Sequence, residues 1–158
     1  MSQLFDRAFE IVIGHEGGYV DNPNDPGGET KYGISRRSYP NEDIQGMTLD
    51  RAKDIYYNDY WLPLQAFDLP DRVAVMLFDM AVNHGKVKAV EILQRGAGVN
   101  DDGILGPDSR VAIRAKDNDT LLQEITVQRI MFYISLGTFK HFGLGWVRRA
   151  VSLLSKLA

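Results

Sequence analysis

The sequence contains no cysteine among its 158 residues. A chain without thiols forms no disulfides, offers no thiolate to a metal ion and has no cysteine nucleophile. Long apolar runs are also missing, since no window approaches the roughly 20 uninterrupted apolar residues that a membrane-spanning helix requires. The N-terminal stretch has acidic residues within its apolar positions and no basic segment before them, unlike a secretory signal peptide. We therefore expect a protein that is made in the cytoplasm without a membrane anchor.

The composition is that of an ordinary soluble globular protein, with 44% apolar and 25% charged residues. The length suits one domain, or one domain with a small appendage, whose core needs no metal or disulfide. Charge is unevenly distributed: residues 1–85 carry 7 Lys/Arg against 14 Asp/Glu, and residues 86–158 carry 11 against 7. The basic second part suits an anionic polymer, although a solvated surface with chance asymmetry explains it equally well.

Apolar residues follow a helical spacing along nearly the whole chain, which predicts a mostly α fold. Ser2 is a candidate N-cap for a first helix that we expect to end at Gly17 and Gly18. This spacing puts Glu16 at the end of the apolar stripe of that helix. A carboxyl group in such a place either faces a cleft or is buried at a cost unless its pKa rises.

Further helices are predicted by the same criteria. Thr48 is the candidate N-cap of a helix that runs to about Trp61. The next helix, from about residue 70 to residue 84, is apolar on nearly all sides, which indicates a central buried helix. Asp79 and Asn83 share one of its faces, which is typical either of a site or of a buried hydrogen-bonded pair. Later helices are expected after residue 86, from near residue 107, from about residue 120, and at the basic C-terminal end.

The segment HEGGYVDNPNDPGGETKYGIS, from His15 to Ser35, is too polar for a core and too rich in glycine and proline for one regular element. An EF-hand calcium loop is excluded because, counted from Asp21, its third, sixth and twelfth positions are Pro23, Pro26 and Tyr32.

Two other ligand sites are excluded by their patterns. The segment PGGETKYG lacks the glycine spacing and the terminal GK[ST] of a phosphate-binding loop. The three histidines, His15, His84 and His141, lack the close spacing of a helical zinc pair. We therefore predict no metal and no organic cofactor.

Acid/base chemistry by carboxyl groups remains. Glycoside cleavage uses one partly desolvated carboxylic acid and usually a second carboxylate in a wetter place. Glu16 fits the first role and Asp25 the second, while the hydroxyl of Thr30 could hold a water or a substrate oxygen. A loop that only caps helices is the alternative.

At these residues the chain resembles a known family. The segment EGGYVDNPNDPGGETKYGIS is similar to the signature of the N-acetylmuramidases of glycoside hydrolase family 108, which occur in phage endolysins, prophages and secretion-linked muramidases. YYNDYWLPL, LPDRVAVMLFDMAVNHG and ILQRGAGVNDDGILGP resemble later blocks of that family in the same order. The resemblance covers essentially the whole chain and implies a lysozyme-like, mostly helical fold. It also implies a catalytic domain at residues 1–90 and a helical peptidoglycan-binding region at residues 91–158.

The resemblance assigns roles to individual residues. Glu16 matches the family's essential acid, which protonates the glycosidic oxygen between N-acetylmuramic acid and N-acetylglucosamine. Asp25 and Thr30 are similar in order to the aspartate and threonine of phage-type lysozymes, which position water or stabilise the oxocarbenium-like state. Their spacing from Glu16 is not quite that of those lysozymes.

Four further residues are candidates for binding the saccharide. Tyr19, Tyr32 and Asn83 lie in matched motifs and could line the groove. Trp61 could stack on a sugar face, or it could belong to the core.

The block LQRGAGVNDDGILGP opens the region that resembles a peptidoglycan-binding domain. Its residues Asp102, Gly103, Gly106 and Pro107 suit a tight turn followed by the start of a helix. They could therefore be structural even in a wall-binding region.

The sequence thus predicts a lysozyme that cleaves the β-1,4 bond of peptidoglycan at the bacterial cell wall or in the periplasm. A phage or prophage lysis role is expected, with export through a separate pore or secretion system. The alternatives are a lytic transglycosylase, and a non-catalytic wall-binding or secretion-accessory protein. Nucleic acid is not an expected partner, because the basic residues form no recognisable nucleic-acid-binding module.

Overall fold

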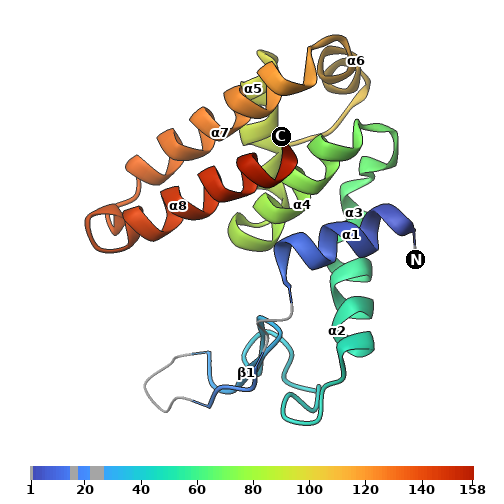
Figure 1. Cartoon of the computed structure of the whole chain (residues 1–158), viewed down its shortest axis with the longest axis vertical. Coiled ribbons are helices and arrows are strands. Elements are labelled where there is room, and N and C mark those ends of the chain that lie inside the picture. The colour runs from blue at the N-terminus through green and yellow to red at the C-terminus, as the bar shows by residue number, and fades with distance from the viewer. Residues whose placement is uncertain (1, 15–17, 22–26) are drawn as a thin grey trace. The chain divides into compact units, whose positions relative to one another are not determined.

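The computed structural model describes residues 2–14, 18–21 and 27–158. Most of these residues are helical, which confirms the predicted fold class (Figure 1). The chain divides into two compact units, Met1–Pro63 and Leu64–Ala158. The predicted domain boundary at residue 90 was based on motif blocks and stays a prediction. No helix in the described part of the chain is long and apolar enough to cross a membrane.

The first unit begins with α1 (Gln3–Val12), capped as predicted by Ser2, whose hydroxyl accepts a hydrogen bond from the amide of Phe5 at 3.2 Å. The predicted end of this helix at Gly17 and Gly18 is wrong, because α1 ends at Val12. Gly14 has a φ of 63°, and its amide donates to the carbonyl of Phe9, so the chain leaves the helix two residues after Val12.

A small antiparallel hairpin follows, made of β1 (Thr30–Lys31) and β2 (Ile34–Ser35). Tyr32 and Gly33 form its two-residue turn with φ angles of 51° and 76°, as a type I′ turn requires. Strands of two residues are too short to give an alternating pattern, which is why periodicity did not predict the hairpin.

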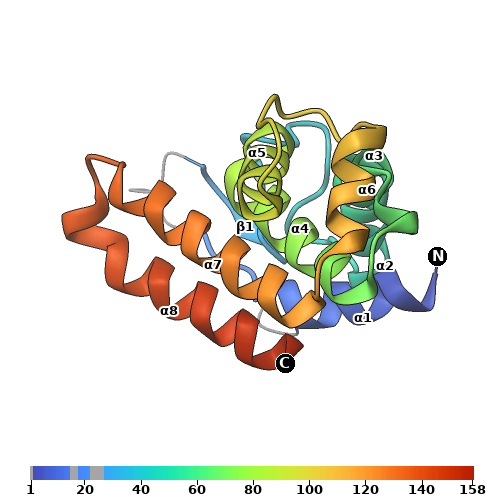
Figure 2. The ribbon, with the colours of Figure 1, turned by 90° about the horizontal axis from the view of Figure 1, so that it is seen from above.

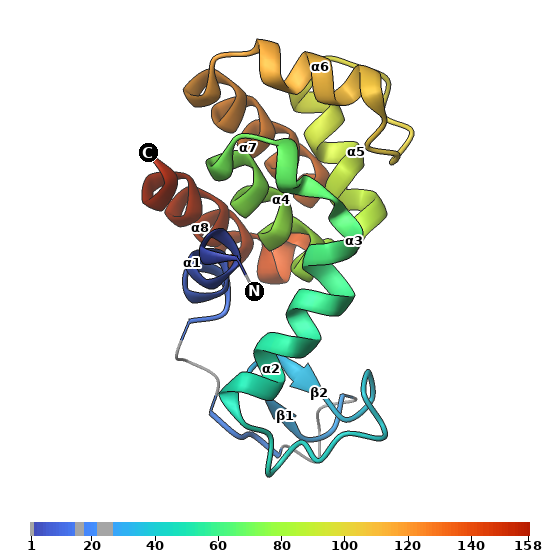
Figure 3. The same ribbon diagram turned by 90° about the vertical axis from the view of Figure 1, so that its right-hand side faces the viewer.

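The rest of the first unit is helical. Thr48 caps α2 (Leu49–Tyr56), as predicted, and the π-helix η1 (Tyr57–Trp61) and short α3 (Leu62–Leu64) continue it without a break (Figure 3). Phe5 of α1 packs edge-on against the ring of Trp61, with 5.6 Å between centroids. Aromatic contacts therefore hold α1 to the helix that follows the hairpin.

The second unit is a helical bundle around α4 (Asp71–His84). Every residue of α4 from Val73 to Ala81 is buried, which confirms the predicted central helix. The long helices α7 and α8 lie side by side in two perpendicular views (Figures 1 and 2). The other elements are the 3₁₀-helix η2 (Ala66–Asp68), α5 (Lys86–Ala97), α6 (Pro107–Ala115), α7 (Asn118–Ile134) and α8 (Phe139–Leu157).

Candidate functional site

Thr30, the predicted positioning residue, is held by its backbone in the hairpin of the first unit. Its amide donates to the carbonyl of Val20 at 2.8 Å, and its carbonyl accepts from the amide of Val20 at 2.9 Å. Thr30 is also paired with Ser35 across the two strands. Val20 and Thr30 lie at opposite ends of the glycine- and proline-rich segment, and these two hydrogen bonds hold the ends together.

A carboxylate that the sequence did not single out, Glu29, lies beside Thr30. The hydroxyl of Tyr19 donates to one of its oxygens at 2.9 Å, and Nε of Arg36 donates to the other at 2.8 Å. The hydrogen bonds from Arg36, and then that from Tyr19, hold the pKa of Glu29 below its usual range. The same carboxylate raises the pKa of Tyr19. We call Tyr19, Glu29 and Arg36 the hairpin clip.

The hairpin clip extends into the loop that follows β2. Nη1 of Arg36 donates to the carbonyls of Glu42 at 2.5 Å and of Pro40 at 3.3 Å. One guanidinium therefore joins the carboxylate before β1 to the backbone after β2. The result is a fixed position for the half-exposed ring of Tyr19, which is 39% exposed.

Tyr32, a predicted groove residue, lies at the tip of the hairpin. Its carbonyl accepts a hydrogen bond from the hydroxyl of Tyr56 in α2 at 2.9 Å. That hydroxyl also fills the space in which a Cβ atom on Gly33 would lie, at only 2.7 Å. Because Gly33 both has a positive φ and faces this contact, the turn tolerates no side chain there.

Two of the three predicted catalytic residues, Glu16 and Asp25, lie outside the described residues. Among the predicted residues of the first unit that are described, Tyr19 and Thr30 are brought together through the Val20 bridge and the hairpin clip. Trp61 is 8% exposed and packs on Phe5, which favours the core role that the sequence left open.

In the second unit, Asp79 and Asn83 have different environments. Asn83 is exposed at the end of α4, and its side-chain amide donates to the carbonyl of Asp79 at 2.7 Å. Asp79 is 1% exposed and forms ion pairs with Arg129 of α7 and Arg149 of α8, both at 2.6 Å. A buried carboxylate between two guanidinium groups ties three helices together, which favours a structural role for Asp79.

His84, at the end of α4, is partly buried beside the same group of side chains. Nε of Arg129 donates to the hydroxyl of Tyr133 at 2.6 Å and to Nε2 of His84 at 3.2 Å. Burial, and next the positive charge of Arg129, lower the pKa of His84 from 6.5 to about 4. His84 is therefore neutral at physiological pH, with Nε2 as an acceptor.

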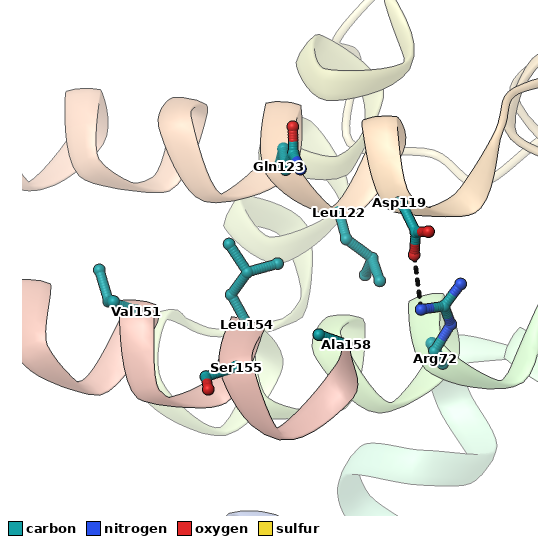
Figure 4. A pocket seen from close by; sticks show the side chains of 8 residues that line it. All are labelled: Arg72, Asp119, Leu122, Gln123, Val151, Leu154, Ser155 and Ala158. Atoms are coloured by element: carbon teal, nitrogen blue, oxygen red, sulfur yellow. Dashed lines mark hydrogen bonds and ion pairs between the residues drawn. The ribbon is translucent and has the colours of Figure 1, made fainter.

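Two cavities of the second unit are lined by residues from α4, α7 and α8. The first measures about 470 Å³; Figure 4 shows Leu122 of α7 and Leu154 of α8 pointing into it beside an ion pair between Arg72 and Asp119 at 2.6 Å. None of the predicted functional residues that the structure describes lines it. The second measures about 230 Å³ and is lined by Asn83, His84, Phe132, Tyr133, Leu136, Trp146 and Arg149.

The predicted turn before α6 is organised by Gln94, which is 1% exposed. Its amide nitrogen donates to the carboxylate of Asp102 at 2.8 Å, and its oxygen accepts from the amide of Gly103 at 2.9 Å. Gly103 has a φ of 74°, and Pro107 is the first residue of α6. These contacts favour the structural role of the turn that the sequence suggested.

No group of three or more histidine, cysteine, aspartate or glutamate side chains that could hold a metal ion lies within the ranges that the structure describes.

Comparison with known proteins finds two matching families and a similar solved structure. The family described as "Glycosyl hydrolase 108" matches residues 9–85, and the family described as "Predicted Peptidoglycan domain" matches residues 88–151. The solved structure "Structure of Brucella abortus SagA" is similar, with 34% sequence identity and a TM-score of 0.84 over 97% of this chain and 92% of that chain. No curated protein gives a significant match. The first match contains the hairpin and α4, and the second contains α7 and most of α8.

Proposed function

The chain belongs to the glycosyl hydrolase 108 family, and from that premise we propose that Glu16 is the general acid of its reaction, with Asp25 and Thr30 as its partners. The protein is a peptidoglycan hydrolase of the muramidase type, since a glycoside hydrolase region is followed by a peptidoglycan domain. The bond cleaved is the β-1,4 linkage between N-acetylmuramic acid and N-acetylglucosamine.

The proposed mechanism divides the chemistry among three side chains. Glu16 donates a proton to the glycosidic oxygen as the bond to the sugar breaks. Asp25 stays ionised and stabilises the positive charge that develops on the sugar ring. The hydroxyl of Thr30 orients the water whose hydroxyl group joins the sugar, and the proton that this water loses restores the protonated state of Glu16.

The observation that carries this proposal is the family match over residues 9–85, which includes all three residues. The hairpin supports it, because both backbone groups of Thr30 bond to Val20 and a rigid backbone is what a positioning residue needs.

Substrate binding is proposed for Tyr19, Tyr32 and Asn83. Tyr19 and Asn83 are exposed, and the backbone at Tyr32 is fixed by Tyr56. Rings with one apolar face and a hydroxyl suit a sugar, which presents both C–H and O–H groups. Trp61 is kept here as a core residue because of its packing on Phe5.

The biological setting proposed is lysis by a phage or prophage, with synthesis in the cytoplasm and passage to the wall through a separate pore. Expression of the chain in a bacterium with and without a co-expressed pore tests this. We expect lysis only with the pore; lysis by the chain alone would show that it reaches the wall by itself.

The test of the reaction is mass spectrometry of purified peptidoglycan after digestion. Wild type should release fragments that end in reducing N-acetylmuramic acid. Glu16→Gln, which cannot donate the same proton, should lose about 10²- to 10⁴-fold in rate. Glu10→Gln is the matched control, because Glu10 is exposed in α1, and it should keep full activity.

Three other outcomes would overturn parts of the proposal. Normal turnover by a folded Glu16→Gln protein would remove Glu16 from the mechanism. Anhydro sugar ends would identify a lytic transglycosylase. Retained binding to sacculi without any cleavage by wild type would identify a wall-binding accessory protein.

A further inference from the structure

The smaller of the two cavities lined by residues of α4, α7 and α8, about 230 Å³, combines features of a ligand site. It lies where the end of α4, the end of α7 and the middle of α8 meet. Its lining includes Asn83, which the sequence predicted to bind the saccharide. Its volume is below the roughly 300 Å³ at which pockets for drug-sized molecules begin. It therefore suits one sugar unit rather than a longer stretch of glycan.

Aromatic side chains form most of the cavity wall. The rings of Tyr133 and Trp146 have centroids 5.5 Å apart, and His84 packs edge-on against Phe132 at 5.4 Å. These contacts between α4, α7 and α8 hold the rings in place before any ligand arrives. Such a wall offers its faces and edges to the C–H groups of a sugar ring at little entropic cost.

Arg149 supplies the charge of the cavity. Its Nη2 and Nε donate to the same oxygen of Asp79 at 2.6 and 3.2 Å, so the guanidinium is fixed in orientation. Its side chain is nevertheless 42% exposed, which leaves it accessible from solvent. A planar guanidinium held in this way is suited to a carboxylate.

The other polar side chains among the described residues of the wall are neutral at physiological pH. His84 carries no charge there, because its pKa is lowered to about 4, and Asn83 is an amide. The charge of Asp79 lies behind the wall, where it is shared between Arg129 and Arg149. Among the described residues that line the cavity, Arg149 alone is ionised.

We infer that this cavity binds a muramyl unit of peptidoglycan, with the sugar ring against Trp146 and a carboxylate of the lactyl group or stem peptide against Arg149. This inference rests on the proposed function, since it names a part of the same substrate. The proposed contact with Arg149 would distinguish N-acetylmuramic acid from N-acetylglucosamine, because the two sugars differ by the lactyl group.

The test is an NMR titration of the full chain, followed through the indole signals of Trp61 and Trp146. N-acetylmuramic acid and an N-acetylmuramyl dipeptide that ends in glutamate are the probes, and N-acetylglucosamine is the neutral control. We expect the Trp146 signal to shift with one or both carboxylate-bearing probes, while the signal of buried Trp61 stays in place. The stronger of the two probes identifies the lactyl or the peptide carboxylate as the group recognised.

A matched pair of variants tests the role of the guanidinium. Arg149→Gln and Arg148→Gln each remove one positive charge from α8, but only Arg149 lines the cavity, and Arg148 is exposed. We expect Arg149→Gln to weaken binding of the preferred probe about tenfold, which equals about 1.4 kcal/mol, and Arg148→Gln to change it less than twofold.

Three results would overturn the inference: no shift of Trp146, equal affinity for N-acetylglucosamine, or equal effects of the two substitutions. If Arg149→Gln does not fold, the Trp146 shifts of the wild type and the comparison of the probes still decide whether the cavity binds a muramyl unit. Digestion of peptidoglycan by the same wild-type sample separates the two proposals. Cleavage without probe binding would support the proposed function and contradict the cavity site. Binding without cleavage would support the cavity site and contradict the proposed function.

Discussion

At the scale of single residues, the hairpin clip shows how one carboxylate can organise a loop. Glu29 accepts hydrogen bonds from Tyr19, ten residues before it, and from Arg36, seven residues after it. The sequence drew attention to Glu16 and Asp25 because of their motif. It gave no reason to pair Glu29 with Arg36, since that contact forms only when the hairpin folds back.

Glu29→Gln should therefore loosen the hairpin that holds Thr30 without removing a reacting group. We expect kcat on peptidoglycan to fall about tenfold, because small displacements of a positioning residue are costly, while KM changes little. In the same variant the pKa of Tyr19 should drop back toward 10, since its raised value depends on Glu29. Steady-state kinetics and an ultraviolet titration of the tyrosines measure the two effects.

The control for Glu29→Gln is Glu42→Gln, which removes an ion pair with Arg51 but keeps the backbone carbonyl that Arg36 uses. It should leave kcat unchanged. Equal losses of activity in both variants would mean that the clip has no special role.

At the scale of elements, α5 and α7 approach each other closely at Gly96. A Cβ atom on Gly96 of α5 would lie 2.9 Å from the backbone nitrogen of Ile125 and 3.0 Å from its Cα. Glycine at this position therefore lets two helices touch through their backbones. Helix propensity alone would disfavour glycine in α5, so its presence is explained by packing.

Gly96→Ala should lower the free energy of unfolding by about 1 to 3 kcal/mol, because α7 would have to move away. Gly145→Ala in α8 is the matched control, since no atom lies within 4 Å of the added methyl group. That substitution should raise stability by up to about 1 kcal/mol through helix propensity. Urea unfolding followed by circular dichroism compares the two, and a stabilised Gly96→Ala protein would contradict the close packing.

At the scale of the whole molecule, the neutral His84 makes stability depend on pH. The unfolded chain takes up a proton on this histidine as pH falls through about 6.5, but the folded chain does so only near 4. Stability is therefore fully present above pH 6.5 and is lost as pH falls toward 4. Because the ring is partly exposed, the loss should be on the order of 1 to 2 kcal/mol.

His84→Gln should remove this part of the pH dependence, whereas His141→Gln, at an exposed histidine, should not. Urea unfolding of the three proteins at pH 4 and pH 7 measures the difference. Parallel losses of stability in wild type and His84→Gln would show that carboxyl groups alone cause the acid sensitivity.

The sequence by itself determined the features that arise within a few residues of each other. Helical periodicity and the N-caps Ser2 and Thr48 predicted where α1 and α2 begin, and the apolar run predicted the buried α4. The glycines and proline before α6 predicted its turn. The family motifs predicted a peptidoglycan hydrolase, which the comparisons confirm.

Only the tertiary structure decided which polar side chains meet. The pattern of α7 and α8 did not reveal that Arg129 and Arg149 face Asp79, whose partner Arg149 is 70 residues away. Capping and periodicity act over about one helical turn, whereas such ion pairs depend on how whole helices pack. The neutral state of His84 and the aromatic cavity beside Arg149 follow from that packing, and so they became visible only in the folded chain.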